Sequence, residues 1–449
     1  MEAQLSRPLM ALRLIFLLCF FSALARCCRF LAAEAAPTLV TRLPGLDGAL
    51  PFRLETGHVF LVRHVRSWTH CKQLHFVHGR YVIVDEEKGS ELFYYFIESE
   101  GDPRRDPVVL WLTGGDRCSV LRALLFEIGP LKIIGEPYNG TIPRLRYHPY
   151  SWTKVASILF VDSPVGAGFS FSRNPTGYHV GEVSSSLQLK KFLTKWSTEH
   201  PYYIANHFYI GGDSAGGKIV PFLAQKISED IEARVRPLIN LKGYLVGNPG
   251  TGESIDFESR VPFLHGMGII SDQLYETIME HCHGEVYTNP KTALCAQASD
   301  RFDRNYGTYL SYFWANNNIT RDALGIKKGS KDEWVRCHEG DLPYSFDIKS
   351  TIKYHRNMTL KGYPALVYSG DHDSAVPFLG TQSWVRSLNF PIVDEWRAWH
   401  LDGQSAGFTI TYTNNLTFAT VKGGGHTAPE FQPERCLAMF RRWVCREPL

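Results

Sequence analysis

The sequence predicts an α/β fold, with a mixed, mostly parallel central sheet flanked by helices and a cap inserted into the sheet domain. Short apolar runs, rich in β-branched or aromatic residues and bounded by turn formers, are typical of buried strands. Helical patterns alternate with these runs, which favours an α/β layer architecture. One polar, cysteine-bearing stretch interrupts the alternation. The expected strands are 108–112, 158–161, 208–210, 365–368 and 418–421.

The N-terminus carries the pattern of a secretory signal peptide over residues 1–25. Arg7 and Arg13 precede an apolar stretch that ends in the small residues of a cleavage site, an order that a merely buried hydrophobic helix does not require. The chain is therefore expected in the secretory pathway, either extracellular or vacuolar. Four glycosylation sequons agree with that route, at Asn139, Asn318, Asn357 and Asn415.

The alternating pattern assigns residues 37–249 and 355–449 to one α/β core, and residues 250–354 are expected to form the inserted cap. Within the core, residues 58–80 are atypical: they are crowded with His, Arg and aromatic residues and have no clean period. We interpret this insertion as intron-derived sequence or a gene-model error, which transcript sequencing across the junction tests. Helical spacing of apolar residues predicts two helices, marked by Ile219, Val220, Leu223 and Ile227, and by Leu437, Met439 and Phe440.

The composition excludes several classes of protein. The chain has 449 residues, 44% of them hydrophobic, so it can bury a large core, and its net charge is only +3. Because the basic residues are scattered, neither nucleic acid nor an anionic membrane is an expected partner. No apolar run after the leader is long enough to span a bilayer. No metal-ligand spacing and no phosphate-binding glycine loop occurs, so neither a metal nor a cofactor is expected.

The segment 207–216, HFYIGGDSAG, contains an apolar strand, a G-x-S-x-G turn around Ser214, and the start of a helix. A sharp strand-to-helix turn needs small neighbours, lifts the serine hydroxyl above the sheet and aims the following backbone N–H groups at an oxyanion. The alternative is a glycine-rich tight turn in which the serine hydroxyl is hydrogen-bonded and has no catalytic role. The strand before and the helix after favour a nucleophilic serine in an α/β-hydrolase fold.

A serine hydroxyl needs an imidazole base, which in turn needs an orienting carboxylate. In α/β-hydrolases these follow in the order Ser, Asp, His, each after a strand. Asp371 and Asp373 both follow the strand 365–368, and His426 follows the strand 418–421 after three glycines. A surface histidine in a flexible loop is the alternative. The long gap between Ser214 and the aspartates fits a cap that roofs the active site.

Several long segments resemble one family, in order along the chain. The chain resembles the plant serine carboxypeptidase-like proteins over most of its length, and more particularly their acyltransferase branch. The segments that carry the resemblance are 110–115 (LWLTGG), 126–130 (FEIGP), 149–156 (PYSWTKVA), 162–166 (DSPVG) and 423–430 (GGGHTAPE).

The resemblance implies roles for particular residues. It makes Asp373, rather than Asp371, the triad acid, and it places the oxyanion donors at the N–H groups of Gly115 and Ala215. In the peptidases an asparagine, a glycine and two glutamates hold the free carboxylate of the peptide. The positions that match these four residues are Thr113, Gly114, Glu127 and Asp213. Two acids near an anionic ligand share a proton, which favours activity at acidic pH.

Thr113 and Asp213 replace the peptidase asparagine and glutamate, and both replacements look like the acyltransferase branch. The resemblance therefore implies a transferase that moves an acyl group from a 1-O-glucose ester to an alcohol acceptor through an acyl-serine. A serine carboxypeptidase is the alternative. A catalytically silent secreted homologue is a third hypothesis, because Arg117 and Ala215 replace the family's glycine and tyrosine beside the nucleophile.

The resemblance also implies two disulfides, Cys118–Cys337 and Cys282–Cys295, that tie the cap to the core. Outside the leader region the number of cysteines is odd, so at least one thiol is expected to be free or paired outside the chain. Asp116 and Arg117 stand where the family has proline and glycine. A buried charge pair there is costly unless the two neutralise each other or reach solvent.

Overall fold

The structure is a computed structural model that describes residues 37–58, 60–61, 76–77, 81–281, 309–338 and 340–449. The chain divides into two compact units, one of residues 1–37 and 58–79 and the other of residues 38–57 and 80–449. The predicted signal peptide and most of the atypical insertion lie outside the described residues. In the first unit the structure describes a short antiparallel pair, β3 (Phe60–Leu61) with β4 (Phe76–Val77).

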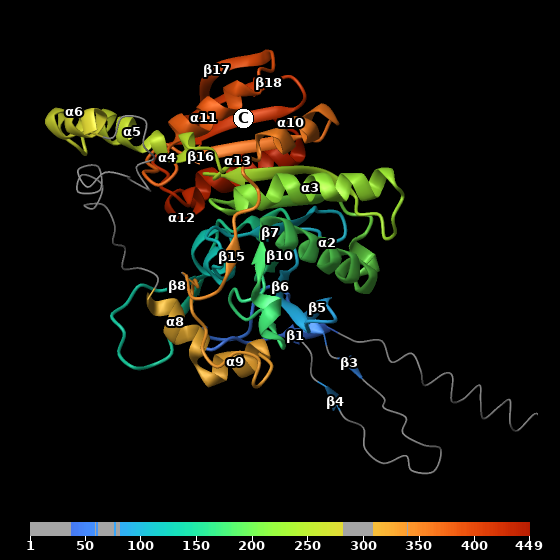
Figure 1. Cartoon of the computed structure of the whole chain (residues 1–449). Helices are drawn as coiled ribbons and strands as arrows, with labels where there is room; N and C mark the ends of the chain where they lie inside the picture. The colour runs from blue at the N-terminus through green and yellow to red at the C-terminus, as the bar shows by residue number, and fades with distance from the viewer. Residues whose placement is uncertain (1–36, 59, 62–75, 78–80, 282–308, 339) are drawn as a thin grey trace, which may run out of the picture. The chain divides into compact units, whose positions relative to one another are not determined.

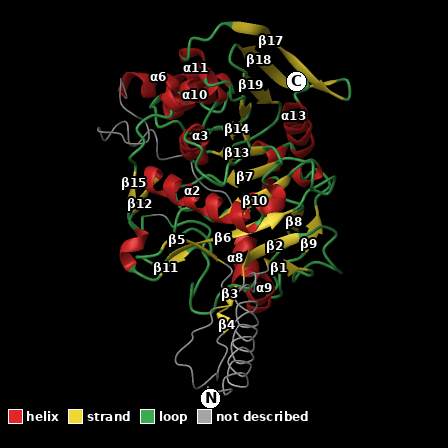
Figure 2. Cartoon of the chain, turned by 90° about the vertical axis from the view of Figure 1, so that its right-hand side faces the viewer, coloured by secondary structure: helices red, strands yellow, loops and turns green. Residues whose placement is uncertain are grey.

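The larger unit is built on one sheet, which has 13 strands among the described residues. Figure 2 shows its strands succeeding one another from β2 and β6 near the bottom to β17 at the top. The strand order is β1-β2-β6-β10-β7-β13-β14-β16-β19-β18-β17, with β5 and β11 also paired to β6. The bounds are β1 (Pro37–Val40), β2 (Leu54–His58), β5 (Tyr81–Asp85), β6 (Ser90–Ile97), β7 (Val108–Leu112), β10 (Ser157–Val161), β11 (Phe171–Ser172), β13 (Phe208–Asp213), β14 (Leu241–Gly247), β16 (Ala365–Gly370), β17 (Ile392–Leu401), β18 (Gln404–Tyr412) and β19 (Leu416–Val421).

The centre of the sheet is parallel and its flanks are antiparallel. Strands β10, β7, β13, β14, β16 and β19 run parallel, whereas β2, β6, β18 and β17 pair antiparallel at the two sides. The predicted mixed, mostly parallel sheet is confirmed, and the five predicted strands are five of the six parallel ones. The sixth, β14, was not predicted, because Lys242 and Gly243 break its apolar run.

Alternate residues of the central strands face two separate cores. Val109 and Trp111 of β7 belong to one core, with Met439 and Phe440 of the last helix. Leu110 of the same strand belongs to the other, with apolar residues of α2 and α3, which lie side by side in Figure 1. Burial on both faces explains why these strands are continuously apolar. The flanking helices are α2 (Glu182–Glu199), α3 (Gly216–Glu232), α10 (Ile352–Leu360), α11 (Phe378–Ser387), α12 (Ala428–Phe431) and α13 (Pro433–Cys445).

Both helices predicted from the sequence are confirmed, as α3 and α13. Within the described residues, no helix is long and apolar enough to cross a bilayer.

The remaining described elements are short. The range predicted as a cap, 250–354, contains α4 (Ile255–Glu258), α5 (Arg260–Gly266), α6 (Asp272–His281), α8 (Tyr309–Asn316), α9 (Asn318–Leu324) and β15 (Tyr344–Ser345). Others are β8 (Leu131–Ile133), β9 (Leu145–Tyr147), β12 (Val180–Gly181), the π-helix η1 (Ala123–Glu127) and the 3-10 turns η2 (Trp152–Lys154), η3 (Pro175–Tyr178) and η4 (Pro201–Tyr203).

Candidate active site

The chain turns sharply between β13 and α3, and Ser214 stands at the turn. Its φ is +50°, a left-handed conformation that is costly for a residue with a side chain and that persists only where the surroundings impose it. The neighbouring strand β7 continues into Gly114, where an added Cβ would lie 2.4 Å from the Ser214 Cβ. Only glycine fits at position 114. Its small size lets Ser214 lie close to β7, at the carboxyl edge of the parallel strands.

Three loops after parallel strands bring Ser214, His426 and Asp373 together. The Nε2 atom of His426 lies 2.8 Å from Ser214 Oγ, and its Nδ1 atom lies 2.9 Å from Asp373 Oδ2. With the proton on Nδ1, the ring can accept the serine proton at Nε2 while Asp373 orients it. The other candidate, Asp371, instead accepts the N–H of Gly423 at 2.6 Å. The geometry therefore favours Asp373 over Asp371.

The environment of His426 strengthens it as a base. Burial disfavours the charged ring, but the adjacent Asp373 carboxylate outweighs burial and leaves the pKa of His426 raised above 6.5. The carboxylate of Asp213 also raises this pKa. A more basic imidazole takes a serine proton more readily, provided that the pH keeps the ring neutral beforehand.

Asn248 supports the acid and was not predicted from the sequence. It directly follows β14, its Nδ2 donates to Asp373 Oδ2 at 2.6 Å, and its Oδ1 accepts the N–H of Gly370 at 3.3 Å. The backbone N–H groups of Ala375 and Val376 donate to the other oxygen of Asp373. A polar residue directly after a buried strand was the available signal, but the strand itself was missed.

Replacing Asn248 with glycine is expected to lower kcat about 10- to 100-fold, since a hydrogen bond to a buried carboxylate typically contributes about 1.5–3 kcal/mol. Glycine is the substitute because φ at this position is +44°, which glycine adopts without strain. The check is kcat and its pH profile on any ester that acylates the protein. An unchanged kcat with an unchanged pH profile would contradict the supporting role.

Gly115 and Ala215 carry the two backbone amides that are predicted to stabilise an oxyanion. Gly115 lies in the cavity wall beside Ser214, and Ala215 is the N-cap residue of α3, where the helix dipole favours negative charge. Among the described residues, neither amide has a recorded acceptor. The roles of Gly115 and Ala215 as oxyanion donors stay predictions.

A cavity of about 450 Å³ opens beside Ser214. Three of the four predicted substrate-binding residues, Thr113, Gly114 and Asp213, line it, but Glu127 is not among its lining residues. Glu127 is buried behind the wall and reaches the site through Arg122, whose Nε lies 3.3 Å from Glu127 Oε1. The other lining residues are Gly115, Cys118, Arg122, Ser214, Arg336, Cys337, His426, Thr427, Glu430 and Phe431.

Arg122 binds carboxylates of two segments and was also not predicted. Besides Glu127 it contacts Glu430, with 2.7 Å between Nη2 and Oε2, and the same Glu430 oxygen accepts the hydroxyl of Thr427 at 2.8 Å. Thr427 follows His426, so this chain of contacts fixes the histidine loop against η1. A lone arginine inside the apolar run 120–126 was the available signal.

Glu127 and Asp213 have strongly perturbed pKa values. Burial, followed by the nearby Asp213 carboxylate, holds the pKa of Glu127 well above 4.5. Burial also raises the pKa of Asp213 to about 6, although His426 and Arg122 oppose that rise. The raised pKa values favour protonated carboxyl groups at acidic pH, and the shared proton that the resemblance implies stays a prediction.

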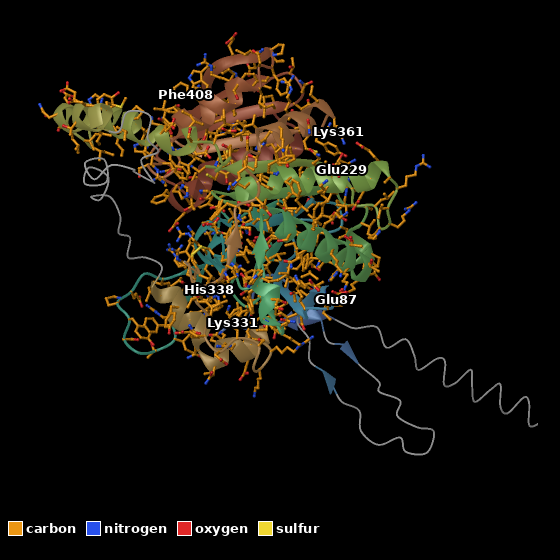
Figure 3. All side chains as sticks on the ribbon, viewed as in Figure 1. Glu87, Glu229, Lys331, His338, Lys361 and Phe408 are labelled. Carbon is orange, nitrogen blue, oxygen red and sulfur yellow. A yellow bond between two sulfur atoms is a disulfide. The ribbon has the colours of Figure 1, made fainter. Side chains whose placement is uncertain are left out.

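Replacing Asp213 with asparagine is expected to shift the acid limb of kcat/KM to lower pH. The base must be neutral, so the rate rises with pH through the pKa of His426, and removing the Asp213 charge lowers that pKa. The matched control is Glu229→Gln, which removes the same charge at a residue of α3 labelled in Figure 3. A limb that stays in place in Asp213→Asn would contradict the coupling.

Asp116 and Arg117, which depart from the family pattern, do not pair with each other. Asp116 is exposed, whereas Arg117 is only 2% exposed and donates to three backbone carbonyls. Its Nη1 lies 3.2 Å from the Val165 oxygen, and its Nη2 contacts the oxygens of Tyr178 (2.5 Å) and Pro343. Arg117 therefore joins three chain segments next to the oxyanion loop.

A second cation, the partly buried Lys331, contacts the same segments. Lys331 Nζ donates to the Gly166 oxygen at 2.8 Å and lies 3.1 Å from Nε2 of His338, both labelled in Figure 3. His338 in turn contacts Asp341 at 2.6 Å. Together with Arg117, Lys331 holds the segment after β10 against the segment that carries Cys337.

The predicted disulfide Cys118–Cys337 is confirmed, with an S–S distance of 2.01 Å. The other predicted pair, Cys282–Cys295, lies outside the described residues. Among the described cysteines, Cys436 is buried and free and Cys445 is exposed and free. The four sequon asparagines, Asn139, Asn318, Asn357 and Asn415, are exposed.

In the described part of the chain, no group of His, Cys, Asp and Glu is arranged to hold a metal ion.

A parallel-centred sheet with Ser, His and Asp meeting at its carboxyl edge defines a serine hydrolase of the α/β-hydrolase fold. The family model for serine carboxypeptidases of the peptidase S10 type matches residues 72–313 and 303–446. The chain belongs to the serine carboxypeptidase family.

Two plant relatives support this family membership, and one solved structure shares the fold. Serine carboxypeptidase-like 3 of Arabidopsis thaliana is 43% identical over 92% of this chain and 94% of its own length. Serine carboxypeptidase-like 11 of the same plant is 45% identical over 92% and 95%. The fold is similar to that of Kex1(Δ)p, a prohormone-processing carboxypeptidase from Saccharomyces cerevisiae, with a TM-score of 0.66 and 16% identity over 88% of this chain and 92% of that one.

Proposed function

We propose that this protein is a serine carboxypeptidase-like acyltransferase, which moves an acyl group from a 1-O-glucose ester to an alcohol acceptor. One contact carries the proposal: the N–H of Gly114 donates to Asp213 Oδ1 at 3.0 Å. In the related peptidases the matching glycine helps to hold the free carboxylate of the peptide. Here an acidic side chain occupies that donor, so a peptide carboxylate loses a partner and meets a second carboxyl group.

A neutral sugar suits the same cavity better than a carboxylate does. Hydroxyl groups of glucose can donate to Asp213 and Glu430 and can accept from Arg122, all of which line the cavity. Thr113 and Thr427 add two hydroxyls to the wall. Arg122 is already neutralised by its carboxylate partners, so it offers hydrogen bonds without an unpaired positive charge.

The reaction follows from the positions of the three side chains. Ser214 Oγ attacks the ester carbonyl carbon while His426 takes the hydroxyl proton, and the N–H groups of Gly115 and Ala215 stabilise the oxyanion. The bond to glucose breaks, and His426 returns the proton to the departing sugar oxygen. His426 then deprotonates the acceptor alcohol, whose oxygen attacks the acyl-serine. The bond to Ser214 Oγ breaks as the new ester forms, and His426 returns the proton to Oγ.

The direct test assays the mature, glycosylated chain with a phenolic glucose ester plus alcohol acceptors, and separately with a blocked dipeptide. Ester exchange without release of a C-terminal amino acid is expected. The alternative, a serine carboxypeptidase, is supported by the raised pKa values of Glu127 and Asp213. Amino-acid release without ester exchange would reverse the ranking.

The double variant Thr113→Asn with Asp213→Glu places the peptidase residue types at both positions. Because a site built to hydrogen-bond one group discriminates strongly against another, we expect ester exchange to fall at least about tenfold and peptide hydrolysis to rise. The control is Thr113→Ser, which retains the hydroxyl. Equal activities of the double variant and the parent on both substrates would contradict the proposed basis of specificity.

The proposal places the protein in the secretory pathway, extracellular or vacuolar. It is supported by the leader pattern over residues 1–25 and by the exposure of all four sequon asparagines. The raised pKa of Asp213, about 6, would keep the carboxyl pair protonated in an acidic compartment such as a vacuole.

A further inference from the structure

A second cavity, of about 400 Å³, lies at the end of the sheet opposite the active site. Pro364 and Asn415, which directly precede β16 and β19, line it. The active-site residues Asp373 and His426 follow the same two strands at their carboxyl ends. Because β16 and β19 are parallel, the two sites lie at opposite ends of these strands. We call this second cavity the β19 groove.

The floor of the β19 groove is a polar patch of the sheet. Asp394, Thr411 and Thr417 stand opposite one another across β17, β18 and β19, and Arg397 stands opposite Thr409 in a second row. All five line the groove. Further along β19 the same face is apolar and belongs to the core that α13 covers. The floor is thus a part of this face that carries hydrogen-bonding groups instead of apolar packing.

The wall of the groove is the end of the C-terminal helix and the tail after it. Trp443 and Arg446 line it together with residues 447–449. The tail is fastened to β17, where Arg397 Nη1 donates to the Leu449 oxygen at 2.8 Å. On the opposite face of β18, Phe408 (labelled in Figure 3) stacks on Trp396, so the polar side is distinct from that aromatic side.

Two residues of a glycosylation sequon belong to this lining. Asn415, the acceptor, is exposed at the turn between β18 and β19, and Thr417 forms part of the floor. A sugar attached to Asn415 therefore starts within the groove itself. The hydroxyl and acetamido groups of N-acetylglucosamine match a floor of threonines and a wall with a guanidinium and an indole, which bind sugar edges and faces respectively.

We propose that the β19 groove is a glycan-binding groove, occupied by the first N-acetylglucosamine of an N-linked glycan on Asn415. The modification joins Asn415 Nδ2 to C1 of the sugar; the nitrogen loses a proton, and the bond from C1 to the lipid pyrophosphate carrier breaks. The bound sugar bridges the sheet floor and the C-terminal tail. The proposal is independent of the reaction at Ser214.

The test compares glycan release at two sites of one molecule. The full chain is secreted from a host that attaches only oligomannose glycans, and the folded protein is treated with peptide N-glycosidase in heavy-oxygen water. Mass spectrometry then gives the release rate at each asparagine. Because a packed sugar must leave its groove before cleavage, release at Asn415 is expected to be at least about tenfold slower than at Asn139, and equal to it after denaturation.

Two variants assign the protection to the groove. Arg446→Gly removes the guanidinium, and glycine suits its φ of +59°, so the helix end is not strained. Thr411→Val removes a floor hydroxyl at nearly constant shape. Each is expected to speed release at Asn415 several-fold and to leave release at Asn139 unchanged. An unglycosylated Asn415, or equal native release rates at Asn415 and Asn139, would overturn the proposal.

Hydrogen exchange tests whether the first N-acetylglucosamine is enough to protect the backbone amides of the tail. Endoglycosidase H leaves one N-acetylglucosamine on the asparagine, so amide protection of residues 443–449 is expected to survive that trimming. Thr417→Val abolishes the sequon but keeps Asn415 in its turn, and it should lose the protection, whereas Thr417→Ser keeps the sequon and should retain it. Equal exchange in Thr417→Val and Thr417→Ser would show that the sugar does not pack there.

Discussion

Replacing Ser214 with alanine is expected to abolish labelling by a fluorophosphonate probe and to lower the acyl-transfer rate by roughly 10⁵- to 10⁶-fold. The reason is geometric: its Oγ is the hydroxyl that lies 2.8 Å from His426 Nε2. Without it no acyl-serine forms, and the oxyanion donors alone leave only a small residual rate. Labelling of the parent chain with intact protein mass spectrometry is the first measurement.

The same experiment separates a working enzyme from a silent homologue. Asp373→Asn should keep the geometry but hold His426 in the wrong tautomer, which costs about 10⁴-fold in a comparable triad. Folding of each variant is checked by circular dichroism and by the Cys118–Cys337 disulfide. A folded parent chain that does not label, or a Ser214→Ala variant that labels equally, would refute Ser214 as the nucleophile.

Replacing Arg117 with alanine is expected to lower the free energy of unfolding by about 3–5 kcal/mol, which is a large effect for one residue. The substitution leaves the carbonyl oxygens of Val165, Tyr178 and Pro343 without this donor inside the protein. It also removes the side chain that joins these segments beside the oxyanion loop. Urea denaturation gives the free energy, and an unchanged m-value assigns the loss to the folded state.

Two neighbouring substitutions control this prediction. Arg117→Lys keeps the charge, but an ammonium group lacks the planar fork that reaches three carbonyls, so an intermediate loss of stability is expected. Asp116→Ala removes an exposed side chain and should change the free energy of unfolding by less than about 0.5 kcal/mol. If Arg117→Ala unfolds at the same urea concentration as Asp116→Ala, the buried guanidinium does not hold these segments.

The sequence alone predicted five of the six parallel strands and singled out Ser214, Asp373 and His426. Strands β7, β10, β13, β16 and β19 are buried on both faces, so each is a continuous apolar run that can be recognised without its neighbours. The chemistry at Ser214 needs a local G-x-S-x-G turn, and Asp373 and His426 each stand in a glycine-bearing loop directly after such a run. These signals lie within a few residues of the side chains that they mark.

Other features depend on residues that are distant in the chain and were decided only by the tertiary structure. Asn248 contacts Asp373 from the next strand, and Arg122 contacts Glu430 across two segments. The sequence left open whether Arg117 and Asp116 neutralise each other or reach solvent, and the structure shows Arg117 bound to carbonyls of three other segments. A hydrogen bond depends on where two atoms meet in space, and a short sequence window does not contain the second atom.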